Sequence, residues 1–162
     1  MNLPATLFIL LWNFAPLRGL ATWYGPPLFN GGDIMRNGQV LDLSARTVAV
    51  DASYVDWLDR KAIVLTECGG VHIVTVTDTG QLYKAGRFRL GISRFTNQLR
   101  YWPVVPNAAN SVPVLQDTID WQGEGAITHR IVADFPRDFF LDEISCDGNE
   151  TLEVRIYVWQ SP

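Results

Sequence analysis

Short runs of apolar and β-branched residues recur along the chain, and turn-forming residues bound each run. Three of them, Arg46–Asp51, Ala62–Glu67 and Val71–Asp78, lie in the first half of the sequence. Two more, His129–Phe135 and Thr151–Trp159, lie near its end. Val, Ile and Thr fit a pleated, half-buried surface, so we predict a β-strand at each of the five runs.

The alternation of the last run predicts which of its faces is buried. Its apolar residues recur at every second position, while polar residues and a tyrosine fall between them. This period of two is typical of a strand with one face on the core. The residues expected on that face are Leu152, Val154, Ile156 and Val158.

Helix signals are weak. The segment Pro136–Ile144 has proline at a plausible first helical position and acidic residues nearby, which predicts one short helix. Ser53–Lys61 predicts a single turn at most. Many short strands with few helices favour a closed barrel or a sandwich.

The stretch from about residue 86 to 128 interrupts the strand pattern. It contains three prolines, asparagine-rich turns and the tryptophans Trp102 and Trp121. Segments this long inside a compact domain are usually functional or disordered, and the aromatic content argues against disorder. We therefore expect an insertion, within one domain spanning 22–162, that packs back on the domain or covers a cleft.

Residues 1–21 differ from the rest of the chain. An apolar run, Leu7–Trp12, is followed by the small residues Gly19 and Ala21 at a spacing typical of a signal-peptidase site. The run is too short for a membrane span, which needs about 20 residues. The segment is either an export signal, which would place the protein outside the cell or in the cell envelope, or an N-terminal structural element.

Composition narrows the class of partner. The chain has 162 residues, of which 12% are aromatic and 19% charged, with a formal net charge of −4. The acidic balance and the lack of a Lys/Arg run argue against nucleic-acid binding. Low charge with many aromatic rings fits a compact β domain, and it also fits polysaccharide binding. We expect the protein to be a monomer.

The chain has two cysteines, Cys68 and Cys146. Their spacing matches no metal-binding motif, so neither a metal nor another cofactor is expected. In an exported protein they could form one disulfide, whereas in the cytosol both would stay free thiols.

The order of several short motifs resembles known double-psi β-barrel domains. The stretch Ala21–Gly25 (ATWYG), the Asn37-Gly38-Gln39 turn and the strand Thr47–Val50 resemble the opening of rare-lipoprotein-A-like domains. Val48–Asp51 (VAVD) and Asp78-Thr79-Gly80 resemble the Asp-Asp-Asp domain of membrane-bound lytic murein transglycosylase A. The resemblance implies a six-stranded double-psi β-barrel with a long insertion and one or two short helices.

The same resemblance implies a site of three aspartates. Asp51 matches the first of the family, Asp78 the second, and Asp134 is the better of two candidates for the third. Val50 stands where the rare-lipoprotein-A pattern has a histidine, so the expected chemistry uses aspartates alone. Residues expected to contact substrate are Trp23, Tyr24, Thr79, Gly80 and Lys84.

In the resembled enzymes one aspartic acid protonates the glycosidic oxygen of peptidoglycan and then deprotonates the 6-hydroxyl of the muramoyl sugar, which gives a 1,6-anhydro product. Such a group needs a raised pKa, which neighbouring carboxylates can provide. Asp78 is the expected acid and base. Ordinary roles stay open: Asp51 can cap a helical turn, Asp78 can shape a turn and Asp134 can end a strand.

Three classes of function follow from the sequence. The leading hypothesis is a secreted lytic-transglycosylase-like enzyme that cleaves cell-wall glycan. The alternative is a non-catalytic carbohydrate-binding or expansin-like wall-loosening module. The third is a structural or interaction domain with the insertion as its contact surface. Convergence of the three carboxylates would favour the enzyme, and a row of exposed rings would favour the binding module.

Overall fold

A computed structural model of the chain describes residues 16–25, 34–80, 82, 86–92, 95, 97–103, 114–121, 131–146 and 152–160. The apolar run Leu7–Trp12 and Lys84 lie outside these residues. Among the described residues, no helix has the length and apolar character that crossing a membrane requires.

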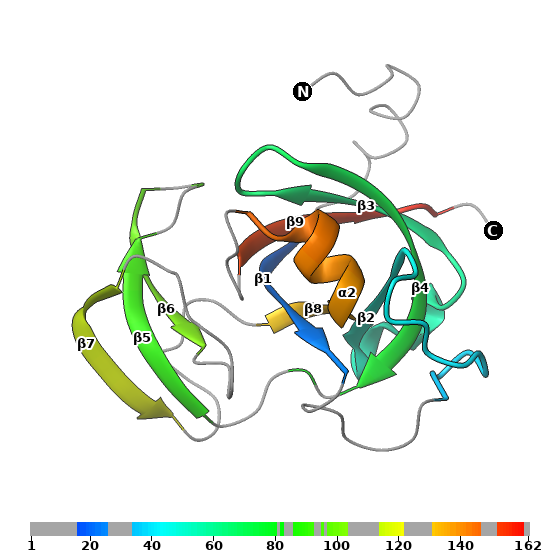
Figure 1. Ribbon diagram of the computed structural model, residues 1–162, viewed down its shortest axis with the longest axis horizontal. Coiled ribbons are helices and arrows are strands. Elements are labelled where there is room, and N and C mark those ends of the chain that lie inside the picture. The colour runs from blue at the N-terminus through cyan, green and yellow to red at the C-terminus, as the bar shows by residue number, and fades with distance from the viewer. Residues whose placement is uncertain are drawn as a thin grey trace.

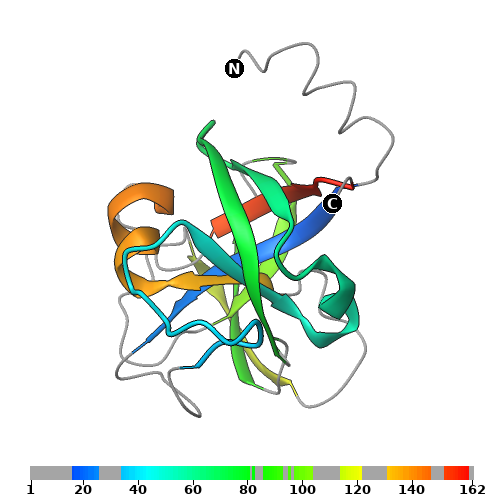
Figure 2. The same ribbon diagram turned by 90° about the vertical axis from the view of Figure 1, so that its right-hand side faces the viewer.

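Six strands close into a barrel in the order β1-β8-β2-β4-β3-β9 (Figure 1 and Figure 2). The strands are β1 (Leu17–Tyr24), β2 (Thr47–Asp51), β3 (Lys61–Thr66), β4 (Val71–Gly80), β8 (Ile131–Pro136) and β9 (Leu152–Val158). Strands predicted from the sequence account for five of them, with ends that differ by a few residues. The sixth, β1, contains the Ala21–Tyr24 part of the ATWYG motif.

The barrel is mixed. β1 pairs with β8 and β2 with β4 in parallel, and all other neighbours in the barrel are antiparallel. Each parallel pair contains a register shift, between Leu20 and Ala21 in β1 and between Val48 and Ala49 in β2. The six-stranded double-psi barrel expected from the sequence is confirmed.

The interior is packed with side chains. Core residues alternate along the strands, as at Val48 and Val50 in β2 and Ala21 and Trp23 in β1. The four residues predicted for the buried face of β9 all belong to this core: Leu152, Val154, Ile156 and Val158. Side chains therefore fill the interior of the barrel, as is usual for a small closed barrel.

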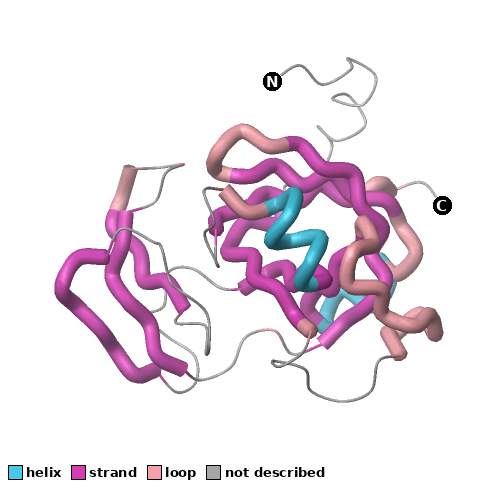
Figure 3. The backbone as a smooth tube through the Cα atoms, viewed as in Figure 1, coloured by secondary structure: helices cyan, strands magenta, loops and turns pink. Residues whose placement is uncertain are grey.

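Two short helices accompany the strands (Figure 3). A 3₁₀ helix, η1 (Ala52–Trp57), follows β2 directly. Helix α2 (Arg137–Phe139) follows β8 and continues as a π-helical turn, η2 (Phe140–Ile144). The helix buries Phe139, Phe140 and Ile144 in the core, so the prediction of a helix at Pro136–Ile144 is confirmed.

The insertion forms a sheet of its own. Strands β5 (Gly86–Ile92), β6 (Leu99–Pro103) and β7 (Val114–Trp121) pair in the order β6-β5-β7, beside the barrel in Figure 1. Phe95, between β5 and β6, contacts β9. The Arg155 guanidinium lies 4.6 Å from the centre of the Phe95 ring. The backbone amide of Phe95 donates to Oε2 of the buried Glu153 at 3.5 Å. The insertion thus packs back on the barrel through these contacts.

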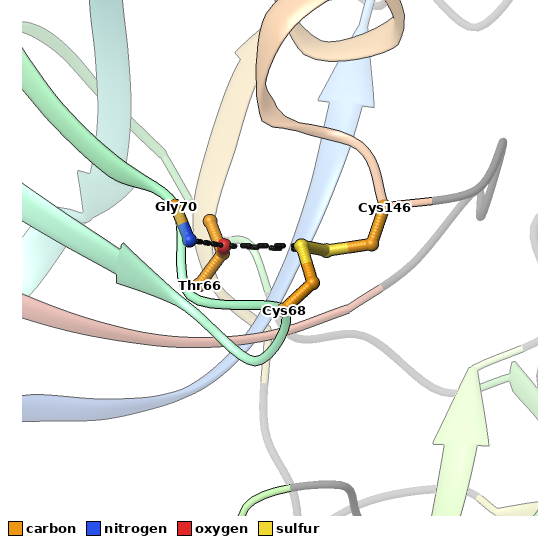
Figure 4. The surroundings of a disulfide bond; sticks show 4 residues. All are labelled: Thr66, Cys68, Gly70 and Cys146. Carbon is orange, nitrogen blue, oxygen red and sulfur yellow. Dashed lines mark hydrogen bonds between the residues drawn. A yellow bond between two sulfur atoms is a disulfide. The ribbon is translucent and has the colours of Figure 1, made fainter. Parts of the chain in front are cut away.

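A disulfide joins Cys68 to Cys146 across 78 residues of sequence (Figure 4). It ties the turn between β3 and β4 to the segment after η2. The Thr66 hydroxyl lies 3.3 Å from Cys68 Sγ and accepts a hydrogen bond from the Gly70 amide. Gly69 has φ +88°, a conformation that favours glycine, so the Cys-Gly-Gly sequence suits this tight turn.

The first strand begins before the boundary expected at residue 21. Leu17–Ala21 pair with Ile156–Leu152 of β9, and Leu20 and Ala21 are fully buried. Residues 17–21 are therefore part of the barrel wall in this structure.

Candidate functional site

One lateral row of residues crosses four adjacent strands of the barrel. Thr22 on β1 pairs with Asp134 on β8, and Asp134 pairs with Ala49 on β2. Ala49 in turn pairs with Asp78 on β4. Side chains of paired residues lie on the same face of a sheet, and the core residues Ala21, Trp23, Val48 and Val50 occupy the other face. The row therefore lies on the outer face, with a small alanine between two aspartates.

Asp134 has a strongly raised pKa because of its surroundings. Its Oδ1 accepts a hydrogen bond of 2.9 Å from the hydroxyl of Thr22, which is itself buried. Burial of the carboxyl raises the pKa of Asp134, the Thr22 hydrogen bond lowers it and the charge of Asp78 raises it, and together they bring it to about 7. A carboxyl with a pKa near neutrality can both give and take a proton at physiological pH.

Asp78 is held by backbone amides. Its Oδ1 accepts from the Arg36 amide at 2.8 Å and from the Thr79 amide at 2.9 Å. The register shift between β2 and β4 brings Asp78, instead of Thr77, opposite Ala49. Asp78 and Asp134 are thus separated by one intervening strand, or about 10 Å between Cα atoms at the usual strand spacing.

Tyr24 and Trp23 lie on opposite faces of β1. Trp23 packs in the core, and its contact with substrate stays a prediction. Tyr24 lies two residues beyond Thr22, on the face of the acidic row. Burial raises its pKa, and the charges of Asp78 and Asp134 raise it further, so the phenol keeps its proton.

Asp51 has a structural role in this fold. Its Oδ2 accepts from the amide of Ser53 at 3.0 Å and from the Ser53 hydroxyl at 2.6 Å. Its φ of −59° and ψ of 149° are those of a helix N-cap. The structure therefore brings Asp78 and Asp134 into one row, while Asp51 caps η1 at the end of β2.

Thr79 and Gly80, which were predicted to contact substrate, directly follow Asp78 in the chain. Thr79 and Gly80 continue β4, paired with Val50 and Asp51, and a Cβ atom added at Gly80 would meet no atom within 4 Å. Across the described stretches of the chain, no group of three or more His, Cys, Asp or Glu side chains could hold a metal ion.

Two site residues were not anticipated from the sequence. The Thr22 hydroxyl could have been found by applying strand alternation to the ATWYG motif, because burial of Trp23 turns Thr22 and Tyr24 to the other face. Met35 has no such signal. Its sulfur accepts a hydrogen bond of 3.2 Å from the Thr77 hydroxyl and one of 3.7 Å from the Tyr24 hydroxyl, contacts between segments far apart in sequence.

Comparison with known proteins gives no family assignment. No protein-family model matches the chain, and no curated protein matches its sequence. The site is therefore interpreted from its geometry and its chemistry.

Proposed function

We propose that this barrel cleaves glycosidic bonds of cell-wall glycan without water as the nucleophile, in the cell envelope or outside the cell. Asp134 is the general acid and base, and Asp78 is the neighbouring carboxylate. The observation that carries the proposal is the raised pKa of Asp134, about 7, in a row that also holds Thr22 and Asp78.

The reaction uses one carboxyl twice. Protonated Asp134 donates its proton to the glycosidic oxygen, and the bond from that oxygen to C1 breaks as the leaving sugar departs as an alcohol. The Asp134 carboxylate then removes the proton of the 6-hydroxyl, and O6 bonds to C1. The product is a 1,6-anhydro sugar, and Asp134 is again protonated.

Asp78 has an electrostatic role in this scheme. Positive charge develops at C1 and the ring oxygen in the transition state, and a fixed carboxylate stabilises such charge. Its charge also helps to keep Asp134 protonated near neutral pH. The sequence favoured Asp78 as the acid, but burial and the raised pKa belong to Asp134, so the proposal exchanges the two roles.

Two lines support cell-wall glycan as the substrate. The motifs at Ala21–Gly25, Val48–Asp51 and Asp78–Gly80 resemble those of barrels that act on peptidoglycan. The acidic row lies on the outer face of the barrel strands, where Asp78 and Asp134 keep partial exposure while Thr22 and Ala49 are buried, so a polymer would reach the row at its two carboxyl groups.

Digestion of purified peptidoglycan tests the proposal. The wild-type protein should release products with 1,6-anhydro ends, and Asp134→Asn should lower the rate by about 10²- to 10⁴-fold, the usual contribution of a general acid–base group. Asp142→Asn, at an exposed position on η2, is the control and should keep full activity. Glycan binding without any product would contradict the proposal and favour a carbohydrate-binding module.

A further inference from the structure

A short turn bordering the acidic row connects it to a buried methionine. The turn, Ile34–Val40, is closed by an isolated β-bridge between its two end residues. Inside it, the Met35 amide donates to the Gln39 carbonyl at 2.8 Å, and the Gly38 amide donates to the Met35 carbonyl at 2.9 Å. Gly38 has φ +90°, which favours glycine at that point of the turn.

The turn is fixed to the barrel on the side that carries Asp78. The Arg36 amide donates to Asp78 Oδ1 at 2.8 Å, and the Asn37 amide donates to the Thr77 carbonyl at 3.1 Å. The Asn37 side chain also donates to Asp59 Oδ1 at 3.0 Å. One of the two amides that orient Asp78 thus comes from the turn, and its position depends on where the turn sits.

Met35 is the buried member of this turn. Its side chain is only 5% exposed, while Ile34 and Val40 are 59% and 60% exposed. Two hydroxyl groups from different strands, Thr77 of β4 and Tyr24 of β1, donate to its sulfur. A thioether is a weak acceptor. The Met35 sulfur nevertheless links the turn to both β4, which carries Asp78, and β1, which carries Thr22.

We propose that Met35 is a positioning residue for the reaction at the acidic row: its sulfur anchors the Ile34–Val40 turn and thereby places the Arg36 amide on Asp78. This inference rests on the proposed function for its catalytic consequence. The anchoring itself can be measured without any activity. A methyl or methylene of the same size would fill the space but could accept neither hydroxyl.

Norleucine, which replaces the sulfur by a methylene, separates these effects. The chain has only two methionines, Met1 and Met35, so growth of a methionine auxotroph on norleucine changes a single sulfur in the described structure. Selenomethionine incorporated in the same way keeps an acceptor and is the matched control. Met35→Leu is the genetic equivalent, and Val40→Ala is a control at an exposed position of the same turn.

The first readout is amide hydrogen exchange. We expect the Arg36 and Asn37 amides to exchange about tenfold faster in the norleucine protein and in Met35→Leu. The Thr79 amide, which donates to the same Asp78 oxygen from within β4, should not change. Unchanged exchange at Arg36 would overturn the proposal.

The second readout is kinetic. Loss of the anchor should lower kcat by about tenfold, with KM nearly constant, because misplacement of about 1 Å at a reacting centre costs up to about 10²-fold. A rise in KM alone, or full kcat despite faster Arg36 exchange, would overturn the positioning role. If the wild-type protein cleaves no glycan, the proposed function fails, and amide exchange alone decides whether Met35 anchors the turn.

Thr77→Val provides a second test of the anchoring role of Met35 if the methionine variants fold poorly. This change removes one of the two donors to the sulfur and keeps the Thr77 carbonyl that accepts from Asn37. It should accelerate Arg36 exchange in the same direction, by a smaller factor. No change at Arg36 in a folded Thr77→Val protein would count against anchoring through the sulfur.

Discussion

Asp78 and Asp134 lie on either side of a single strand, and each is paired in register with the same residue, Ala49. The two aspartates are 56 residues apart in sequence and come from the two halves of the barrel on either side of the insertion. The alanine leaves the space between them free of a large side chain. Burial is the main cause of the raised pKa of Asp134, and this relationship lets the charge of Asp78 add to it.

The first prediction concerns stability against pH. The pKa of Asp134 is raised from 3.8 to about 7, so the folded protein binds a proton that the unfolded chain has released between these values. The stability contributed by protonated Asp134 is full below about pH 4 and is lost as pH rises through about 7, by on the order of a few kcal/mol. Urea unfolding from pH 4 to pH 8 should show this decline.

Asp134→Asn should remove that part of the pH dependence, because an amide does not titrate. Asp56→Asn, which removes an exposed carboxyl on η1, is the control. If the difference in unfolding free energy between wild type and Asp134→Asn stays constant from pH 4 to pH 8, the raised pKa is refuted.

The second prediction concerns the Thr22 hydroxyl. Because its hydrogen bond lowers the pKa of Asp134, Thr22→Val should raise that pKa and move the alkaline limb of the kcat/KM profile to higher pH. The lost bond should also cost about 1 kcal/mol of stability. Thr22→Ser, which restores the hydroxyl, should return the limb toward its wild-type position. A limb that moves to lower pH in Thr22→Val would show that the hydroxyl acts differently.

The third prediction separates a structural from a catalytic role for Asp51. Asn is as good an N-cap as Asp, whereas Ala is poor. Asp51→Asn should therefore keep stability, and Asp51→Ala should lose about 1 kcal/mol in chemical denaturation. Both variants should keep glycan-cleaving activity close to wild type. A large loss of activity in the stable Asp51→Asn protein would return Asp51 to the site.

The fourth prediction concerns the disulfide. Closing a loop of 78 residues restricts the unfolded chain by roughly 4 kcal/mol in the chain-entropy model. Replacing Cys68 and Cys146 by alanine should lower the free energy of unfolding by up to that amount. Activity of the folded variant should persist, since Cys68 lies in the turn before β4 and Asp78 lies near the end of that strand. Equal stability with and without reductant would contradict the prediction.

The fold could be predicted from the sequence where burial imposes a period of two. In β9 the alternating residues Leu152 to Val158 identified the core face. Pairing between distant strands could not be read in the same way. The register shift that brings Asp78 opposite Ala49 depends on how β2 and β4 pack, and no local pattern in the sequence encodes it.

The candidate site was predictable in part for the same reason. Asp78 and Asp134 stand at recognisable positions in their strands, but their roles depend on burial and on contacts to Thr22 and Arg36. Asp51 had an equally strong motif, yet its carboxylate caps η1 through Ser53. Met35 carries no sequence signal, because its contacts join segments that meet only in the folded barrel.

The most direct test of the central claim is digestion of peptidoglycan in ¹⁸O-labelled water, with the product ends analysed by mass spectrometry. If Asp134 acts as both acid and base with O6 as the nucleophile, the wild-type products carry 1,6-anhydro ends without ¹⁸O, and Asp134→Asn gives almost none. Reducing ends labelled with ¹⁸O, or undiminished 1,6-anhydro product from Asp134→Asn, would contradict this account.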